Sequence, residues 1–256
     1  MSRRVVPKRS LGQHFLLDRN LLDVIGRLAE LSPDDVVLEI GPGLGVLTEY
    51  LADRVAHVHA VEIDRSLAEQ LPERENVSVI QGDALQVDLH ALRPLAGKLV
   101  ANLPYNVATP IVVESLDGLP DLQLWCVMVQ REVADRFFAE PGTKAYGAVS
   151  ALIQLAAERT GFHPVSRTVF RPRPNVDSAL VAFQRRPFPE RYAETKRVVQ
   201  AAFAHRRKTL ANSLELAGAA SRAEAGAALE RIGLRQTARA ESLTPSDFAR
   251  LAEALA

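Results

Sequence analysis

A short apolar run that ends in three closely spaced glycines constrains the fold more than any other stretch. Residues 36–40 read Val-Val-Leu-Glu-Ile, and Gly41, Gly43 and Gly45 follow at alternate positions. An apolar, β-branched run of this length is typical of a buried strand. The glycines after it can adopt positive φ and let a ligand approach the backbone. Because open α/β sheets bind ligands beyond the carboxyl ends of their strands, this stretch predicts a cofactor site.

The first two-thirds of the chain alternates between strand-like and helix-like segments. Further buried strands are expected at 55–64, 77–83, 98–102 and 122–129. Alternation of this kind indicates the α/β class, with a Rossmann-like, doubly wound and mostly parallel sheet. Segments 167–170 and 178–183 are expected to pair with each other as closing strands.

The chain changes character at Pro187-Phe-Pro189. Helices are expected beyond this point at 191–203, 208–216, 223–232 and 246–254. Ser221 and Thr244 are expected to cap the last two helices, and Gly233 is expected to end the first of that pair. The sequence therefore divides into an α/β domain at 1–186 and a small helical domain at 187–256.

Composition excludes several kinds of protein. The one cysteine, Cys126, lies in an apolar run, so an internal disulfide is impossible and a cysteine-built zinc site is not expected. The histidines at 57, 59, 90 and 163 lack metal-ligand spacing, and no metal is expected. No apolar run approaches the ~20 residues of a membrane helix, and no signal peptide is visible. We expect a cytoplasmic protein without a membrane partner, and a monomer.

The net charge of zero conceals an uneven distribution of charged side chains. Residues 1–10 carry four basic side chains, namely Arg3, Arg4, Lys8 and Arg9, and no acidic one. Residues 11–156 carry 10 basic and 21 acidic side chains, whereas residues 157–210 carry 12 basic and 4 acidic ones. Two basic segments of this kind suit a polyanion such as nucleic acid. A solvated surface is the alternative that charge alone leaves open.

The glycine spacing and the acidic residues at nearby strand ends favour one class of cofactor. A dinucleotide fingerprint would need glycine at position 46, which is Val46, so a dehydrogenase is disfavoured. Glu62 ends the second strand and can accept both ribose hydroxyl protons. Asp83 ends the third strand and is placed to accept from an adenine amino group. Because these carboxylates suit a sulfonium cation better than a pyrophosphate, we expect S-adenosylmethionine, with S-adenosylhomocysteine as its product.

The segment Asn102-Leu103-Pro104-Tyr105 follows the fourth strand and predicts a site for an amino group on a base. The exocyclic amine of adenine is a poor nucleophile, because its lone pair is delocalised into the ring. The side-chain oxygen of Asn102 and a backbone carbonyl at Leu103–Pro104 can accept its N–H bonds and align it. Pro104 stiffens the segment, and Tyr105 can stack on the base. A tight Asn-x-Pro turn with a packing tyrosine is the alternative.

Two more segments are candidates for contacts with nucleic acid. Phe170 begins a proline-rich stretch and could cover the face of the base opposite Tyr105, while Arg171 and Arg173 could contact phosphates. A basic run at a helix junction consists of Arg206, Arg207 and Lys208. The alternatives are a proline-rich loop with a core phenylalanine and a solvated helix end.

Several blocks in order resemble one family, the ribosomal RNA adenine N6-dimethyltransferases, and most closely its bacterial small-subunit branch. The blocks that carry the resemblance lie at 8–17, 39–45, 102–110, 130–134, 144–147, 170–178 and 203–210. Asn-Leu-Pro-Tyr-Asn at 102–106 and Pro-Asn-Val-Asp-Ser at 174–178 look like the small-subunit branch. The antibiotic-resistance relatives, which modify large-subunit rRNA, tend to have Asn-Ile-Pro-Tyr instead.

The resemblance implies dimethylation of two adjacent adenosines in a hairpin near the 3′ end of small-subunit (16S) rRNA, with this rRNA or a pre-small subunit as the partner. It implies cofactor contacts at or beside Gln13, His14, Leu16, Gly41, Gly43, Gly45, Glu62, Ile63, Asp83, Ala84 and Asn102. His14 stands where many relatives have Asn, and either side chain can hydrogen-bond the cofactor. Residues 1–186 would then be the methyltransferase domain with its basic arm, and 187–256 the RNA-substrate domain.

Other functions stay open on the sequence alone. A large-subunit rRNA adenine methyltransferase and a DNA adenine methyltransferase share the same chemistry. A ribosome-assembly factor, whose binding matters more than its chemistry, is the alternative of another class.

Overall fold

The structure, a computed structural model, describes residues 13–16 and 18–256, and these residues form two compact units. The first unit contains the described residues up to Ala134 together with Arg159–Arg185. The second unit contains Asp135–Glu158 and Arg186–Ala256. The contacts of residues 135–158 therefore assign this segment to the same unit as the helices after residue 186. The division of catalytic and RNA-substrate roles between the two parts stays a prediction.

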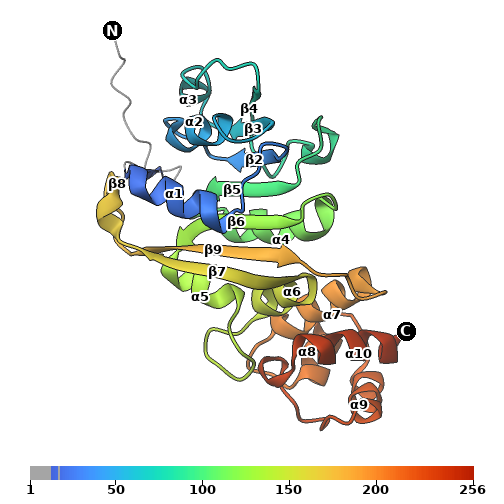
Figure 1. Cartoon of the computed structure of the whole chain (residues 1–256). Coiled ribbons are helices and arrows are strands. Elements are labelled where there is room, and N and C mark those ends of the chain that lie inside the picture. The colour runs from blue at the N-terminus through green and yellow to red at the C-terminus, as the bar shows by residue number, and fades with distance from the viewer. Residues whose placement is uncertain (1–12, 17) are drawn as a thin grey trace. The chain divides into compact units, whose positions relative to one another are not determined.

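The first unit is organised around a seven-stranded sheet with the strand order β4-β3-β2-β5-β6-β9-β7 (Figure 1). The strands are β2 (Val36–Ile40), β3 (His57–Glu62), β4 (Val77–Gln81), β5 (Lys98–Asn102), β6 (Leu124–Gln130), β7 (Ala157–Val165) and β9 (Ser178–Arg185). The pairs β3–β4, β2–β3, β2–β5 and β5–β6 are parallel, and β6–β9 is antiparallel. The expected doubly wound, mostly parallel α/β fold is confirmed.

The central strands are mostly apolar because both of their faces are covered. In β6 every residue from Leu124 to Val129 is buried, whereas the edge strand β4 is partly exposed throughout. Trp125 of β6 stacks on Phe183 of β9, with ring centroids 5.2 Å apart and an interplanar angle of 8°. The indole nitrogen of Trp125 donates to Ser115 Oγ at 2.8 Å, so its one polar atom is satisfied inside the core.

The helices of the α/β part begin and end at local signals. They are α1 (Arg19–Leu28), α2 (Val46–Ala52), α3 (Arg65–Ala68) and α4 (Ala108–Gly118), with a short 3₁₀ turn, η2, at Leu89–Ala91. Helix α5 (Arg131–Phe137) begins in this part, and its last three residues belong to the second unit. Asp18 caps α1 by accepting a hydrogen bond from the backbone N–H of Asn20 at 2.9 Å. The buried face of α1 consists of Leu21, Leu22 and Ile25.

The predicted pairing of 167–170 with 178–183 is wrong. Residues 167–169 form a short 3₁₀ turn, η3 (Arg167–Val169), and β8 (Phe170–Arg171) pairs antiparallel with β1 (Phe15–Leu16) in a separate two-stranded sheet. Strand β9 lies instead between β6 and β7. Strand β7 was not predicted, because it is an edge strand that lacks a regular apolar pattern. It contains charged residues, a glycine and a proline, as edge strands often do.

The second unit is helical apart from its short boundary segments. Its elements include α6 (Ala148–Ala156), α7 (Tyr192–Ala204), α8 (Leu210–Leu216), α9 (Arg222–Arg231), η4 (Ala240–Ser242) and α10 (Pro245–Leu255). Helix α7 contacts α6, α8 and α10, and α9 contacts α8 and α10. At the centre Tyr146 is fully buried and donates from its hydroxyl to the Leu243 carbonyl at 2.8 Å. The predicted cap at Ser221 and stop at Gly233 are confirmed.

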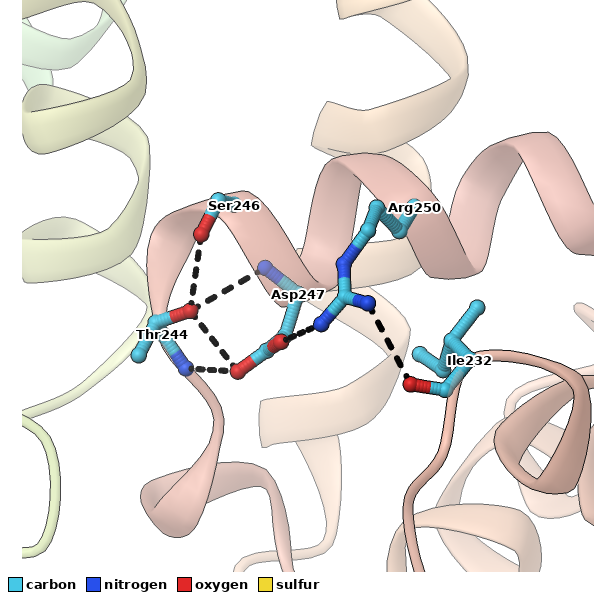
Figure 2. A network of polar contacts seen from close by, with 5 residues as sticks. All are labelled: Ile232, Thr244, Ser246, Asp247 and Arg250. Atoms are coloured by element: carbon cyan, nitrogen blue, oxygen red, sulfur yellow. Dashed lines mark hydrogen bonds and ion pairs between the residues drawn. The ribbon is translucent and has the colours of Figure 1, made fainter.

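Figure 2 shows how polar contacts hold the start of α10. Thr244 Oγ1 accepts from the backbone N–H of Asp247 at 3.1 Å, and the backbone N–H of Thr244 donates to Asp247 Oδ2 at 2.9 Å. Asp247 also pairs with Arg250, whose other terminal nitrogen donates to the Ile232 carbonyl at 3.3 Å. Arg250 therefore links the capping box of α10 to the end of α9.

Replacing Thr244 with alanine should lower the free energy of unfolding by about 1 kcal/mol, because the first turn of α10 loses its side-chain cap. Thr244→Ser keeps the hydroxyl and should retain most of that stability. Chemical denaturation followed by circular dichroism measures both variants. Equal losses for serine and alanine would contradict the capping role.

Candidate active site

A pocket of the first unit lies at the carboxyl ends of β2, β3 and β5, next to residues 13–16. Of the residues predicted for cofactor binding or catalysis, its lining brings together Gln13, His14, Leu16, Gly41, Gly43, Glu62, Ile63, Asn102, Leu103, Pro104 and Tyr105. It adds residues that the sequence analysis did not assign, namely Phe15, Glu39, Pro42, Leu44, Val46, Leu47 and Leu67. Two stretches that are about 60 positions apart in sequence thus share one pocket, as their places at strand ends predict.

The glycine turn forms one side of the pocket. Gly41, Gly43 and Gly45 have φ angles of 72°, 60° and 76°, a region that favours glycine. A Cβ atom on Gly41 would lie 3.1 Å from the ring of Pro104, and one on Gly43 would lie 3.0 Å from Phe15. Side chains at these two positions would therefore push apart the segments that form the pocket.

Gly45 has a different environment from the other two glycines. It is the N-cap residue of α2 and is not part of the pocket lining. A Cβ atom at Gly45 would lie 3.1 Å from both Leu71 and Pro72. Its contribution in this structure is the close packing of the turn.

Glu62 presents a buried carboxyl group at the end of β3. Its Oε2 accepts from the backbone N–H of Gly43 at 3.1 Å, and its Oε1 accepts from the backbone N–H of Asp64 at 2.9 Å. Burial raises the pKa of Glu62 above its ordinary value, although these two hydrogen bonds oppose the shift. The carboxyl group thereby connects the glycine turn to the end of β3.

Asp83 and Ala84 lie beside the pocket but outside its lining. They follow β4, and the backbone N–H of Gly82 donates to the Glu62 carbonyl at 2.9 Å, which places this turn next to the end of β3. Asp83 Oδ1 accepts from the backbone N–H of Leu85 at 3.0 Å. In the sheet, β4 is the neighbour of β3 and is two strands away from β2.

Two exposed apolar side chains lie at the pocket. Leu44 in the glycine turn is 42% exposed, and Ile63 after β3 is 46% exposed. Large apolar side chains at this level of exposure on the wall of a pocket suit the flat face of a heterocyclic ring.

The amide of Asn102 is oriented by the backbone of residue 14. Asn102 Nδ2 donates to the His14 carbonyl at 3.1 Å. Because a carbonyl only accepts hydrogen bonds, this contact assigns the nitrogen to His14 and leaves Oδ1 as the acceptor for another group. The backbone N–H of Leu103 donates to the Met128 carbonyl at 3.1 Å, which holds the following segment against β6.

Tyr105 and His14 lie close together in the pocket, with ring centroids 5.3 Å apart and an interplanar angle of 31°. The Tyr105 hydroxyl hydrogen-bonds Ser178 Oγ at 2.6 Å, and burial raises the pKa of the phenol above its ordinary value. His14 Nδ1 lies 2.7 Å from the Pro172 carbonyl, so Nδ1 carries a hydrogen. Residues 13–16, the Asn102–Tyr105 segment and the loop after β8 are therefore joined by polar contacts.

Phe170 is not part of the pocket lining. It is 4% exposed, pairs with Leu16 and belongs to a buried apolar cluster. Arg171 and Arg173 after it are exposed. Its strand partner Leu16 lines the pocket, so Phe170 lies directly behind a residue of the pocket wall.

The predicted RNA-binding residues of the second unit are exposed, but they are not equivalent. Arg206 donates to the Tyr146 carbonyl at 3.0 Å, whereas Arg207 and Lys208 have exposed side chains in the same turn. Arg3, Arg4, Lys8 and Arg9 lie outside the described residues.

Glu39 is the charged lining residue that sequence analysis missed. It is 1% exposed, and its Oε2 has no hydrogen-bond partner in the described part of the chain. Burial raises the pKa of Glu39 to about 8, with a smaller contribution in the same direction from Glu62, while the hydroxyl of Thr48 lowers it. The presence of a glutamate inside the otherwise apolar run 36–40 could have identified Glu39 as a candidate site residue.

Residues 13–16 and 18–256 show neither a metal site nor a membrane-spanning helix. No cluster of three or more His, Cys, Asp or Glu side chains there could hold a metal ion. None of the helices in that part of the chain combines the length and apolar character that crossing a membrane requires.

The sheet order, the glycine turn and the carboxylate at the end of the next strand define the class of Rossmann-like methyltransferases. A solved dimethyladenosine transferase from Plasmodium falciparum has the same fold, with a TM-score of 0.77 over 93% of this chain and 96% of that chain, at 24% identity. The solved 23S rRNA methyltransferase ErmE has a TM-score of 0.70 over 94% of this chain and 99% of that chain, at 30% identity.

The chain belongs to the ribosomal RNA adenine dimethylase family, whose model matches residues 6–256. A relative from Thermobifida fusca (strain YX) is 48% identical over 96% of this chain and 90% of its own length. A relative from Rubrobacter xylanophilus is 47% identical over 96% of this chain and 94% of its own length. Both relatives are named ribosomal RNA small subunit methyltransferase A.

Proposed function

We propose that this protein transfers methyl groups from S-adenosylmethionine to the N6 amino groups of two adjacent adenosines, in a hairpin near the 3′ end of 16S rRNA. The observation that carries the proposal is the orientation of Asn102, whose Oδ1 is left to accept from an amine in a pocket that also contains Glu62 and the glycine turn. The names of the relatives at 48% and 47% identity support the small subunit as the source of the rRNA. A monomeric, cytoplasmic enzyme of small-subunit biogenesis is part of this proposal.

The lining fits the proposed cofactor in polarity and shape. Glu62 would accept the ribose hydroxyls, since each carboxylate oxygen can take a further hydrogen bond beyond its one backbone N–H. Leu44 and Ile63 would cover the faces of the adenine, and Asp83 with Ala84 would contact its edge from the neighbouring turn. Gln13, His14 and Leu16 would lie over the cofactor from the other side. When bound, S-adenosylmethionine supplies an electrophilic methyl group on its sulfonium.

The residues after β5 would orient the acceptor adenosine. Asn102 Oδ1 and a backbone carbonyl at Leu103–Pro104 would accept the two N–H bonds of the amine, which favours a pyramidal nitrogen with its lone pair directed away from the ring. Tyr105 would stack on the base, worth ~1–3 kcal/mol. Because its pKa is raised, Tyr105 stays a neutral phenol at physiological pH and acts through its ring. Phe170 is proposed for the opposite face of the base.

A transfer assay tests the proposed substrate. The protein is incubated with labelled S-adenosylmethionine and with naked rRNA, small subunits or large subunits, and the modified bases are mapped. We expect two dimethylated, adjacent adenosines near the 3′ end of 16S rRNA. Label on a large-subunit adenosine would make the chain a counterpart of ErmE instead, and absence of label on every RNA would refute the proposed activity.

The basic run at 206–208 is proposed to contact the RNA backbone, together with Arg171, Arg173 and the basic arm. Because Arg206 already binds the Tyr146 carbonyl, Arg207 and Lys208 give the sharper test. Removing both with alanine should reduce the slope of log Kd against log salt concentration by about 2, since each phosphate contact contributes roughly 1. Filter binding of rRNA across a salt series measures the slope.

A control variant separates this effect from a general loss of charge. Arg74 is an exposed cation of the first unit that pairs with Asp53 at 3.0 Å. Arg74→Ala should leave the salt slope of the wild-type protein unchanged. An unaltered slope in the Arg207→Ala, Lys208→Ala double variant would show that this run does not contact the RNA.

A further inference from the structure

The two edge strands of the seven-stranded sheet differ in the residues that protect them from further pairing. Strand β7 contains Glu158, Arg159, Gly161 and Pro164, which are residue types that commonly protect an open edge. Strand β4, at the opposite edge in Figure 1, reads Val-Ser-Val-Ile-Gln and contains no charged residue, glycine or proline. Because β-branched residues favour strand pairing, β4 is an edge that suits the addition of another strand.

The register of the sheet determines which backbone groups of β4 face that open edge. The backbone N–H of Gly82, just after β4, donates to the Glu62 carbonyl of β3 at 2.9 Å. Alternate residues of a parallel strand bond to the same neighbour. Val79 and Gln81 therefore direct their N–H and C=O groups away from β3, toward the open side. Both residues are exposed, and Val79 is 41% exposed, so a further strand could reach these groups.

A hollow beside the β4 edge would contact the side chains of an added strand. It is lined by Val77 and Val79 of β4 and by residues from α3 and the segment after it. Its apolar lining outside β4 consists of Ala68, Leu71 and Pro72, and its charged lining residues are Glu69, Glu73, Arg74 and Glu75. The hollow therefore combines apolar surface with a mainly acidic set of charges.

The negative charges of this hollow are only partly compensated. Glu69 pairs with an arginine of its own helical turn at 2.8 Å, and Arg74 pairs with Asp53 at 3.0 Å. Glu73 and Glu75 are exposed, and neither forms an ion pair with another described residue. The hollow is thus suited to a partner that brings positive charge.

We propose that the β4 edge is a docking site for an extended, Lys- or Arg-rich protein segment, which adds to the sheet as a further strand. The main chain of the segment would pair with Val79 and Gln81. Its basic side chains would lay their aliphatic stems over the apolar part of the hollow and place their charges at Glu73 and Glu75. None of these residues lines the active-site pocket, so the docking site is separate from the proposed methyl transfer.

The charges of the hollow disfavour other occupants of this edge. An RNA backbone is itself negative and binds proteins mainly through Lys and Arg. A second copy of the chain, paired edge to edge about a two-fold axis, would bring its own Glu73 and Glu75 to the same interface. Because like charges that face each other across paired strands are destabilising, a basic segment is the occupant whose charge complements the site.

Fluorescence anisotropy with a labelled, end-capped peptide of alternating Lys and Thr tests the docking site on the full-length protein. Val79→Pro removes an N–H that an added strand needs and that the sheet itself does not use, so peptide affinity should fall at least about tenfold. Val79→Thr keeps the N–H and the β-branched shape, and it should bind like the wild type. Circular dichroism melting of each variant checks that the fold is retained.

The contribution of charge is tested separately. The double variant Glu73→Gln, Glu75→Gln should bind the peptide about 2- to 25-fold more weakly at low salt, the range expected for two exposed ion pairs. Glu190→Gln, which removes an exposed glutamate of the second unit, should leave the affinity unchanged. Equally tight binding of a peptide of alternating Glu and Thr would overturn the proposal.

Amide hydrogen exchange of the wild-type protein, followed by NMR, does not depend on the folding of a variant. Adding the Lys–Thr peptide should slow exchange at Val79 and Gln81, while Ser78 and Ile80, which already bond to β3, should change little. Absence of peptide binding, equal affinity in Val79→Pro and Val79→Thr, or no added protection at Val79 and Gln81 would overturn the proposal. Self-association of the wild type that Val79→Pro abolishes would assign the edge to a second copy and would overturn it too. None of these outcomes bears on methyl transfer, which the labelled-rRNA assay measures independently.

Discussion

Replacing Asn102 with alanine should abolish methyl transfer, with a fall in kcat of at least about 10²–10³-fold, the range found when one preorganised polar group is removed from an active site. The physical reason is that the amine of adenine is a weak nucleophile that must be held with its lone pair directed at the methyl group. Cofactor affinity should change little, because Glu62 and the glycine turn remain. Single-turnover rates on small subunits and calorimetric binding of S-adenosylmethionine give the two quantities separately.

A matched variant tests whether the orientation of the amide matters as well as its presence. In Asn102→Asp the side chain keeps its shape, but an oxygen replaces the nitrogen that donates to the His14 carbonyl at 3.1 Å. Two acceptors would then face each other, so we expect activity as low as in the alanine variant. Near-normal turnover in Asn102→Ala would refute the assigned role, and normal turnover in Asn102→Asp would show that the contact with His14 is dispensable.

Removing the ring of Tyr105 should have the next largest effect. Tyr105→Ala loses a stacked base contact worth ~1–3 kcal/mol, which corresponds to a decrease of roughly 5- to 150-fold in kcat/KM. Tyr105→Phe keeps the ring and loses only the hydrogen bond to Ser178 Oγ, so it should stay close to the wild type. Steady-state kinetics with rRNA as the varied substrate measure both variants.

The second half of the proposed sandwich needs a different substitution. Phe170 is 4% exposed within an apolar cluster, and truncation of a core phenylalanine to alanine costs about 3–5 kcal/mol of stability. Phe170→Leu removes the aromatic face while filling most of the space. We expect a loss of kcat/KM with Phe170→Leu in the same range as for Tyr105→Ala. Unchanged kinetics in both variants would rule out the sandwich.

Local signals were sufficient for much of the fold. The glycine turn, the apolar runs of β2 and β6, and the caps at Asp18, Ser221 and Thr244 all depend on residues within four or five positions of one another. The predicted helices beyond residue 190 agree with the observed ones to within two residues at each end. Such features can be predicted because hydrophobic period and capping are properties of a short segment.

The candidate site was predictable only in part. The carboxyl ends of parallel strands meet at one edge, so the places of Glu62 and Asn102 at the ends of predicted strands were enough to put both at the cofactor edge. The error at β8 and β9, by contrast, arose because pairing partners are chosen by the whole sheet. Strand β9 pairs with β6 along seven residues, which is a longer contact than the predicted neighbour at 167–170 could offer.

The sequence by itself determined the class of the protein, because a glycine turn after a buried strand and an Asn-Leu-Pro-Tyr segment after another leave little choice of fold or chemistry. Only the tertiary structure decided how individual side chains are used. The amide of Asn102 is oriented by a carbonyl 88 positions away, Phe170 packs in the core beside Leu16, and the Oε2 atom of Glu39 is buried at the pocket without a hydrogen-bond partner among the described residues. These properties depend on which distant groups surround a side chain, and no periodicity or short motif encodes them.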